Sequence, residues 1–248
     1  MSDLAGKTTI VVGASRGLGR GIATAFAAEG APVVAVARTA EALAELASTA
    51  STIQPEVADA GDASVAANLL DRYEPEVVVL VAGAGPHMRP LQQQTWETFS
   101  ANWYADVRIT FNWLREILLK PLRPGSRVIV ISSGAALAGS PLSGGYAGAK
   151  ATQRFIAAYA QDESRRAGLD ITVTAVMPKM TPFGEVGRLG VRAYAARGGE
   201  TEEAYLKELG ELLTPEIAGS ALVDLVRADP ATTAPGYLLT AAGLQKLP

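Results

Sequence analysis

A tyrosine–lysine pair in the middle of the chain has the residue types and the spacing needed for acid–base chemistry. Tyr146 and Lys150 are four residues apart in a stretch with helical periodicity. We therefore expect both side chains on one helix face, with Cβ atoms about 5–6 Å apart. A lysine ammonium at that distance favours the phenolate form of tyrosine, which allows the phenol to act as an acid or a base. Such a pair also arises by chance, but Ser133, 13 residues upstream at the expected mouth of a strand, strengthens the pattern.

A glycine-rich turn near the N-terminus is typical of dinucleotide binding. It follows the first expected strand and opens a helix. Glycines let the backbone turn sharply and approach a pyrophosphate, while the helix N-terminus supplies free N–H groups and a partial positive charge. The alternative is a plain turn that binds nothing. The residues expected to contact the cofactor here are Gly13, Ser15, Arg16, Gly17, Leu18 and Gly19.

Two arginines near this turn indicate which dinucleotide is held. A site that prefers NAD places a carboxylate at the end of the second strand, where it binds the ribose 2′-hydroxyl. This chain has Ala37 and Arg38 there, 19 residues beyond Gly19. A guanidinium pairs well with phosphate, so Arg38, helped by Arg16 from the turn, is expected to bind a 2′-phosphate. We predict NADP(H) in preference to NAD(H), the alternative being that both arginines are solvated surface residues.

The composition disfavours several other kinds of chemistry. The 248 residues contain no cysteine and one histidine, His87, which excludes a thiol nucleophile and argues against a histidine triad or a metal site. A net charge of −3 without a basic cluster argues against nucleic acid. The apolar stretches are far shorter than the roughly 18 residues that span a bilayer, and the N-terminus lacks a signal-peptide layout. We expect a soluble cytoplasmic protein with no metal, nucleic-acid or membrane partner.

The elements that must position these residues are those of an α/β protein. Short β-branched runs alternate with longer alanine- and leucine-rich segments of helical period. The nearly continuous apolar strands predict a doubly wound parallel sheet of about seven strands, with helices on both faces of a single domain, 1–248. The expected strands are 8–12, 32–37, 52–57, 76–81, 126–131, 170–176 and 236–240. The expected helices are 18–29, 40–50, 62–73, 96–119, 145–166 and two beyond the sixth strand.

One long excursion follows the sixth strand. Residues 178–199 are rich in glycine, proline and arginine, so we expect them to be irregular, and a charged helix follows at 201–213. Ligands of open parallel sheets bind outside the carboxyl ends of the strands. We therefore predict that residues 182–213 form a lid over the substrate pocket that is mobile without ligand. The alternative is a well-packed pair of surface helices.

Taken together, the motifs resemble the classical short-chain dehydrogenase/reductase family over essentially the whole chain. The resemblance implies a single-domain Rossmann fold, a nicotinamide cofactor and hydride transfer at a carbonyl or carbinol carbon. It also implies a catalytic tetrad and an aspartate, Asp59, that contacts adenine. The tetrad residues at matching positions are Asn102, Ser133, Tyr146 and Lys150.

The resemblance gives each tetrad residue a role that its chemistry allows. Tyr146 exchanges a proton with the substrate oxygen, and Ser133 hydrogen-bonds and orients that oxygen. Lys150 favours the phenolate and holds the nicotinamide ribose. Asn102 anchors a water molecule that relays protons onward.

Three motifs depart from the family pattern, and the one near the C-terminus, an Asp-Gly-Gly-like stretch, reads Ala241-Ala242-Gly243 here. The family's Asn-Asn-Ala-Gly after the fourth strand reads Ala-Gly-Ala-Gly at 82–85, so the packing around the nicotinamide is expected to differ. The family's Pro-Gly after the sixth strand is Pro178-Lys179 here, and the threonine that normally follows is Thr181. The further cofactor contacts expected from these motifs are Ala82, Gly83, Pro178 and Thr181.

These observations predict an NADP(H)-dependent carbonyl reductase or alcohol dehydrogenase that acts on a small carbonyl or alcohol molecule. One alternative is a dinucleotide-binding regulatory protein that has lost turnover, which the altered motifs allow. A sugar-nucleotide epimerase or dehydratase is a lesser alternative, because such proteins have a longer fold. Helices 96–119 and 145–166 carry apolar residues around more than one face, so we also expect a homodimer or homotetramer.

Overall fold

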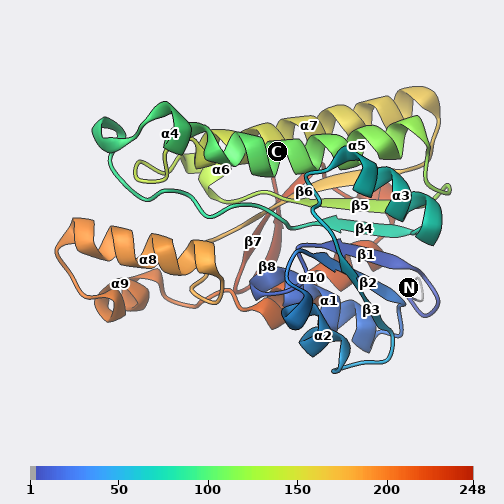
Figure 1. Ribbon diagram of the computed structural model, residues 1–248, viewed down its shortest axis with the longest axis horizontal. Coiled ribbons are helices and arrows are strands. Elements are labelled where there is room, and N and C mark those ends of the chain that lie inside the picture. Colours follow the sequence, from blue (N-terminus) through green and yellow to red (C-terminus); the bar gives the residue numbers. More distant parts are fainter. Residues whose placement is uncertain (1–3, 248) are drawn as a thin grey trace.

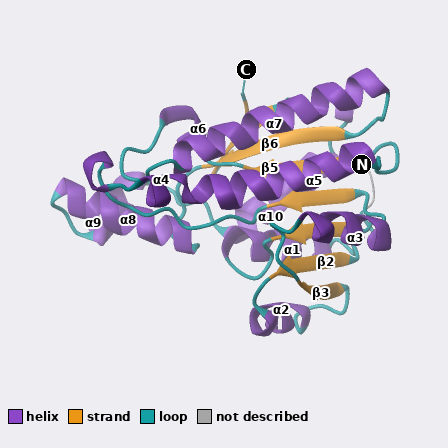
Figure 2. Cartoon of the chain, turned by 45° about the horizontal axis from the view of Figure 1, so that its top comes forward, coloured by secondary structure: helices purple, strands orange, loops and turns teal. Residues whose placement is uncertain are grey.

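The computed structural model describes residues 4–247, and within them an eight-stranded sheet forms the centre of the molecule (Figures 1 and 2). Its order is β3-β2-β1-β4-β5-β6-β7-β8, in which the first seven strands run parallel and β8 pairs antiparallel to β7. The chain moves outward in one direction from β1 to β3 and then crosses to β4 on the other side of β1. Such a reversal opens a crevice at the carboxyl ends of the strands. The strands are β1 Thr9–Val12, β2 Val33–Ala37, β3 Ile53–Val57, β4 Val77–Leu80, β5 Arg127–Ile131, β6 Thr172–Pro178, β7 Gly236–Thr240 and β8 Gly243–Lys246.

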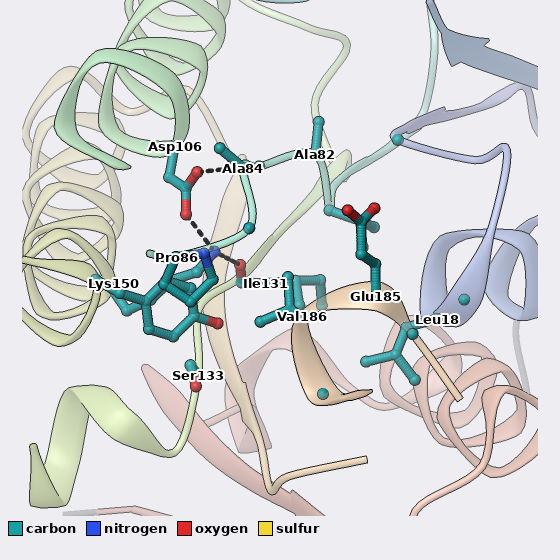
Figure 3. Close-up of a pocket in the computed structure, with 18 of the residues that line it drawn as sticks. Leu18, Ala82, Ala84, Pro86, Asp106, Ile131, Ser133, Lys150, Glu185 and Val186 are labelled. Atoms are coloured by element: carbon teal, nitrogen blue, oxygen red, sulfur yellow. Dashed lines mark hydrogen bonds and ion pairs between the residues drawn. The ribbon is translucent and has the colours of Figure 1, made fainter. Parts of the chain in front are cut away.

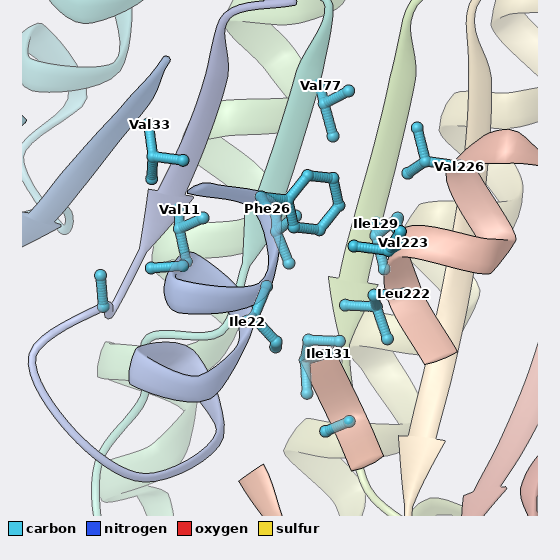
Figure 4. Packing of buried hydrophobic residues seen from close by; sticks show 14 of the residues in the cluster. Val11, Ile22, Phe26, Val33, Val77, Ile129, Ile131, Leu222, Val223 and Val226 are labelled. Carbon is cyan, nitrogen blue, oxygen red and sulfur yellow. The ribbon is translucent and has the colours of Figure 1, made fainter. Parts of the chain in front are cut away.

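Helices cover both faces of the sheet (Figure 1). On one face α1, α2 and α10 bury apolar residues such as Phe26 and Leu222 against strand residues such as Ile129 (Figure 4). On the other face α3, α5 and α7 do the same, with Trp113 of α5 fully buried. The helices are α1 Gly17–Ala28, α2 Ala40–Ala47, α3 Ala63–Tyr73, α4 Trp96–Asn102, α5 Arg108–Leu119, α6 Ala135–Ala138, α7 Tyr146–Ala167, α8 Glu185–Gly198, α9 Glu202–Leu209 and α10 Pro215–Arg227. Short turns are η1 Leu91–Gln93, η2 Trp103–Val107 and η3 Pro230–Thr232.

The doubly wound α/β fold expected from the sequence is confirmed, and so are its seven parallel strands. Pro55 lies in β3, where it pairs with Ala35. Because β3 is the edge strand, its outer side lacks a neighbour in the sheet, and proline is tolerated there. The eighth strand was not expected, since β8 follows β7 after a turn of two residues and is only four residues long.

Two segments differ from the sequence-based expectation. The helix expected over residues 96–119 is interrupted by a π-helical turn, η2, which separates α4 from α5. The segment 178–199, expected to be irregular, contains the 14-residue helix α8. This helix starts after Gly184 and ends at Gly199, which adopts the left-handed conformation that favours glycine (φ 71°). Gly184 and Gly199 therefore mark the two ends of α8, while Gly187 and Gly190 within it allow the loop after β6 to pack closely against the helix.

Helices α8 and α9 extend beyond the carboxyl ends of the strands, at the left of Figure 1. They pack on each other, and the rings of Tyr194 and Tyr205 stack between them with centroids 6.3 Å apart. Across residues 4–247, none of the helices combines the length and apolar character required to cross a bilayer.

Candidate active site

A cavity of about 1000 Å³ lies at the carboxyl ends of the parallel strands, where the change in strand order opens the crevice. Its walls come from the loops that follow β1 to β6 and from α8. This volume is at the upper end of the range for ligand pockets, as a site for both a cofactor and a substrate requires. With the exception of Asn102, it is lined by all the residues that the sequence indicated: Gly13, Ser15, Arg16, Gly17, Leu18, Gly19, Arg38, Asp59, Ala82, Gly83, Ser133, Tyr146, Lys150, Pro178 and Thr181.

The glycine turn fits the pyrophosphate of a dinucleotide. Gly13 has a φ of 96°, and a Cβ there would lie 2.6 Å from the backbone nitrogen of Ala82. A Cβ on Gly19 would lie 2.1 Å from the carbonyl oxygen of Gly13, so only glycine permits this tight turn. Helix α1 then begins at Gly17, and its N-cap residue Arg16 supplies no side-chain hydrogen bond within the described chain. The first residues of α1 line the cavity. Because the first N–H groups of a helix have no partner within it, they can receive an anionic group there.

Three arginines line the cavity on the side of the glycine turn and of the loops after β2 and β3. Arg38 is exposed directly after β2, and Arg16 is exposed in the turn. Asp59, after β3, accepts a hydrogen bond of 2.9 Å from the N–H of Gly61. The third arginine, Arg108, comes from α5, and a Cβ on Gly61 would lie 2.9 Å from its guanidinium. Sequence reasoning missed Arg108, because only the packing of α5 brings it beside the loop after β3.

Helix α8 forms another part of the cavity wall. Its first residue, Glu185, forms an ion pair with Arg16 at 2.5 Å, and both side chains are largely exposed. Farther along α8, the hydroxyl of Tyr194 lies 2.7 Å from the Oγ of Ser140, in the loop after α6. A Cβ on Gly85 would lie 3.2 Å from Leu189. The helix thus contacts the glycine turn, the loop after β4 and the loop after α6.

Ser133 and Tyr146 enter the cavity from two different elements. Ser133 follows β5, is half-buried, and its Oγ accepts a hydrogen bond of 3.2 Å from the N–H of Ala135 (Figure 3). Tyr146 is the first residue of α7 and is also half-buried. A Cβ on Gly145 would lie 2.2 Å from the carbonyl oxygen of Phe99, so the helix can start here only after a glycine.

Lys150 lies one turn farther along α7, with a side chain that is only 6% exposed. Its Nζ is 5.5 Å from the centre of the Tyr146 ring, so the two side chains meet on one face of the helix. The same Nζ donates a hydrogen bond of 3.5 Å to the carbonyl oxygen of Ile131. The carbonyl oxygen of Lys150 accepts one of 2.7 Å from the Oγ of Ser132. These bonds tie α7 to the end of β5.

A buried carboxylate completes the surroundings of Lys150. Asp106, in η2, is fully buried, and its Oδ2 lies 3.2 Å from the lysine Nζ (Figure 3). Its Oδ1 accepts a hydrogen bond of 2.7 Å from the N–H of Ala84. Burial by itself lowers the pKa of Lys150, but the charge of Asp106 together with Tyr146 outweighs it, so this pKa is raised above its usual value.

Asn102 is the one predicted site residue that does not line the cavity. It is buried at the end of α4, and its Nδ2 donates a hydrogen bond of 2.8 Å to the carbonyl oxygen of Ala84. The structure thus brings Asp106, and not Asn102, against Lys150. Both side chains hold the peptide groups of Ala84, in the loop after β4. The role of Asn102 in a proton relay stays a prediction.

The sequence around Asp106 contains one feature that indicates a buried, paired carboxylate. Asp106 lies among apolar and aromatic residues, Trp103 to Val107, where a carboxylate is costly unless it is paired. A continuous helix would have placed Asp106 one turn from Asn102. The π-helical turn instead alters the spacing of the side chains in this region.

The residues after β6 connect the site to α8 and α10. Pro178 accepts a backbone hydrogen bond of 2.8 Å from Gly134, next to Ser133. The hydroxyl of Thr181 donates one of 2.6 Å to the carbonyl oxygen of Leu213, so it links the two ends of the α8–α9 segment. A Cβ on Gly187 would lie 1.6 Å from the carbonyl oxygen of Thr181, which shows how closely α8 approaches this loop.

The wall of the cavity near α8 is apolar and aromatic. This part includes Met88 from the loop after β4, Leu137 from α6 and Met180 from the loop after β6, with Val186, Tyr194 and Tyr205 from α8 and α9. Among the described residues, no cluster of histidine, aspartate and glutamate side chains could hold a metal ion.

Comparison with known proteins places this geometry in a family. The family described as short chain dehydrogenase matches residues 7–187. A hydroxynaphthalene reductase-like protein of Metarhizium majus is 31% identical over 193 residues, which cover 71% of this chain and 68% of that protein. An uncharacterized oxidoreductase of Bacillus subtilis is 30% identical over 190 residues, 72% of this chain and 70% of that protein.

Solved structures share the fold. A short chain dehydrogenase from Mycobacterium avium is similar with a TM-score of 0.79 at 22% identity, over 100% of this chain and 86% of that one. A dehydrogenase/reductase from Sinorhizobium meliloti is similar with a TM-score of 0.73 at 22% identity, over 94% and 93%. The family implies a nicotinamide dinucleotide cofactor, which the glycine cradle fits. The chain belongs to the short chain dehydrogenase family and is an oxidoreductase of that family.

Proposed function

We propose that this protein is an NADP(H)-dependent reductase that acts on carbonyl compounds. In this enzyme Tyr146 is the general acid of the reduction and the general base of the reverse reaction. The observation that carries the proposal is the layout of one cavity. Ser133, Tyr146 and Lys150 line it together with a glycine cradle and three arginines. A nicotinamide bound beside the first group would supply the hydride, and the arginines would hold the adenosine end.

Ser133, Tyr146 and Lys150 have different tasks in this reaction. Ser133 donates a hydrogen bond to the substrate oxygen and fixes its position. Tyr146 gives its phenolic proton to that oxygen as negative charge develops there. Lys150 stabilises the phenolate that remains and can hold a ribose hydroxyl, since an ammonium has three donors and its Nζ uses only part of them on Asp106 and Ile131.

The preference for NADP(H) rests on the charges beside the end of β2. Arg38 is the first residue after that strand, and no carboxylate occupies its place. Arg16 and Arg108 line the same cavity, so a 2′-phosphate would meet positive charge. A 2′-hydroxyl gains little from these groups, because a guanidinium only donates hydrogen bonds and a phosphate offers more acceptors and charge.

The substrate that fits the proposed site is an apolar, ring-containing ketone. The wall near α8 offers two methionines and two stacked tyrosines, and flat apolar rings pack well on such side chains. The relative from Metarhizium majus is named for reduction of hydroxynaphthalenes, which are fused aromatic compounds. Residues 182–213, which include α8 and α9, act as the lid that encloses this substrate.

The proposal is tested by following NADPH absorbance with purified protein and a panel of aliphatic ketones, aryl ketones, fused-ring ketones and quinones. We expect turnover with NADPH, best with the ring-containing ketones, and slower turnover with NADH. Tight binding of NADPH without turnover of any compound in either direction would instead favour a silent dinucleotide-binding protein.

A further inference from the structure

Asp106 is a buried charge that the proposed reaction does not use directly. Its carboxylate is completely buried in the wall of the cavity. An unpaired carboxylate in such a place would be strongly unfavourable. Here Oδ2 faces the ammonium of Lys150 at 3.2 Å, while Oδ1 accepts the N–H of Ala84 at 2.7 Å. Oδ1 therefore has a hydrogen-bond donor, whereas Oδ2 has no hydrogen bond among the described residues and is compensated by the ion pair with Lys150 alone.

The surrounding residues hold Asp106 in this position. Its backbone carbonyl accepts hydrogen bonds of 3.0 Å from the hydroxyl of Thr110 and of 3.2 Å from the Nε2 of Gln153. Gln153 lies on α7, less than one turn after Lys150, so the helix that carries the lysine also holds the backbone that carries the carboxylate. This arrangement fixes the two charged groups relative to each other.

Gly83 provides the space that the carboxylate fills. A Cβ at this position would lie 2.8 Å from Oδ1, 2.9 Å from Cγ and 3.0 Å from Oδ2 of Asp106. The departure from the family pattern at residue 83 and the buried carboxylate at residue 106 are therefore spatially linked. A side chain at 83 would displace Asp106 from Lys150.

We propose that Asp106 is a positioning residue for the reaction: it holds Lys150 as an ammonium ion beside Tyr146 and thereby sets the pH range in which this pair works. The inference rests on the proposed function, because it assigns Asp106 a part in the acid–base step. Asp106 touches neither substrate nor cofactor in this account and acts only through Lys150.

The charges that act on Lys150 come from two elements. Among the described residues, Asp106 in η2 and Tyr146 in α7 are the titratable groups whose charge is felt at the lysine. Its other contacts are the carbonyl oxygen of Ile131 in β5 and the hydroxyl of Ser132, which are neutral. A negative charge at 106 disfavours loss of the proton from Lys150, so its removal lowers the pH at which the lysine loses that proton.

The first test is the pH dependence of NADPH-linked reduction in the wild type and in Asp106→Asn. The amide has the shape of the carboxylate and can still accept the N–H of Ala84, but it carries no charge. Reduction needs both the phenol and the ammonium, so we expect the alkaline limb of kcat/KM to move down by about one pH unit or more.

Asn102→Ala is the matched control for this test. It removes the other side chain that holds Ala84 and leaves the Asp106–Lys150 pair in place. We expect a lower rate at every pH and an alkaline limb at the wild-type position. An Asp106→Asn profile that is lowered uniformly, with the limb unmoved, would overturn the proposal and leave Asp106 a structural residue.

The second test needs no turnover and so separates this inference from the proposed function. The ¹⁵Nζ signal of Lys150 is followed by NMR in Tyr146→Phe, which removes the coupled phenol, and is identified by its loss in Tyr146→Phe/Lys150→Met. We expect an ammonium that keeps its proton to a higher pH than an ordinary lysine does. In Tyr146→Phe/Asp106→Asn the ammonium should lose its proton at a clearly lower pH.

The outcomes of the second test are decisive even if no carbonyl substrate is turned over. Equal midpoints in the two proteins would overturn the role of Asp106. If Asp106→Asn does not fold, Tyr146→Phe alone still decides, because a Lys150 that is neutral at pH 8 has no effective counter-charge and contradicts the proposal.

Discussion

Lys150 is surrounded by groups that keep it charged, and this decides what it can do for Tyr146. The ammonium is held between a carboxylate, a carbonyl oxygen and the tyrosine ring. Paired buried charges of this kind contribute little net stability, but removal of one partner leaves the other uncompensated and is costly. The pairing is therefore better explained by what it does to the neighbouring phenol than by a stabilising effect on the fold.

The four-residue spacing of Tyr146 and Lys150 was visible in the sequence, but the carboxylate that lies beside Lys150 was not predicted. The Tyr146–Lys150 spacing depends only on local helix geometry, which the sequence pattern reports. The approach of Asp106 depends on the π-helical turn η2 and on the absence of a side chain at Gly83, which are features of tertiary packing. The hydrogen bond from Asn102 to the carbonyl of Ala84 also depends on this packing and was not predicted.

At the cofactor end, the charge of Arg38 is predicted to set the preference between the two dinucleotides. A charge-assisted contact to phosphate contributes about 1.5–3 kcal/mol, so Arg38→Asp should reduce or invert the preference for NADPH by roughly tenfold or more. Fluorescence titration of both cofactors gives the two Kd values. Arg192→Asp, which changes an exposed arginine of α8 outside the cavity lining, is the matched control. Equal Kd values for NADPH and NADH in the unmodified protein would contradict the prediction.

At the scale of elements, α1 packs closely against α10. A Cβ on Gly21 would lie 2.4 Å from the carbonyl oxygen of Pro215, and one on Gly219 would lie 2.6 Å from the Cβ of Ala25. The backbones of the two helices are thus in contact. This contact fixes the N-terminus of α1 and, with it, the glycine cradle.

Gly219→Ala should disturb this contact. Because the added methyl group would overlap α1, we expect a loss of about 1–3 kcal/mol in the free energy of unfolding, measured by urea denaturation, together with weaker NADPH binding. Gly148→Ala is the control, since a Cβ there meets only the Trp103 ring at 3.8 Å. If both variants are equally stable, close packing of α1 on α10 is not what holds the cradle.

Residues 182–213 line part of the cavity, but the sequence did not predict that the helix α8 forms within this segment. Its many glycines argued for an irregular chain, yet α8 forms because Gly187 and Gly190 allow the helix to pack against Thr181 and Met180. Close packing cannot be distinguished from flexibility by composition alone. The edge strand β8 escaped notice for a related reason, since four residues after a tight turn carry too little pattern.

The lid proposal predicts how α8 exchanges its amide hydrogens. Few of its residues are buried, namely Gly190, Val191 and Ala195, and its ion pair with Arg16 is exposed. We expect amides 186–199 to exchange faster than those of α7 in the free protein and to slow when NADP(H) and substrate are added. Protection equal to that of α7 without ligand would favour the alternative, a well-packed pair of surface helices.

For the whole molecule, the exposed faces of η2, α5 and α7 predict self-association. These neighbouring elements (Figure 2) expose large apolar side chains, which is unusual for a monomer. They are Trp103, Tyr104, Phe111, Phe155 and Tyr159. We expect a homodimer or a homotetramer with these helices paired across two-fold axes.

Light scattering on the wild type and on Phe155→Glu/Tyr159→Glu tests the assembly. A charge on each side chain would be buried in the interface, so the variant should have a smaller mass at the same micromolar concentration. A lysine substitution at Leu209, an exposed residue of α9, is the control and should leave the mass unchanged. A wild-type protein with the mass of a single chain would contradict the prediction.

The most direct measurement of the central claim compares Tyr146→Phe with the wild type in NADPH-linked reduction of the best substrate. Loss of the phenolic proton should lower kcat by a factor of about 10²–10⁴, while the Kd of NADPH stays close to the wild-type value because the ring and Lys150 remain. A variant that reduces every accepted substrate at nearly the wild-type rate would contradict the assignment of Tyr146 as the acid.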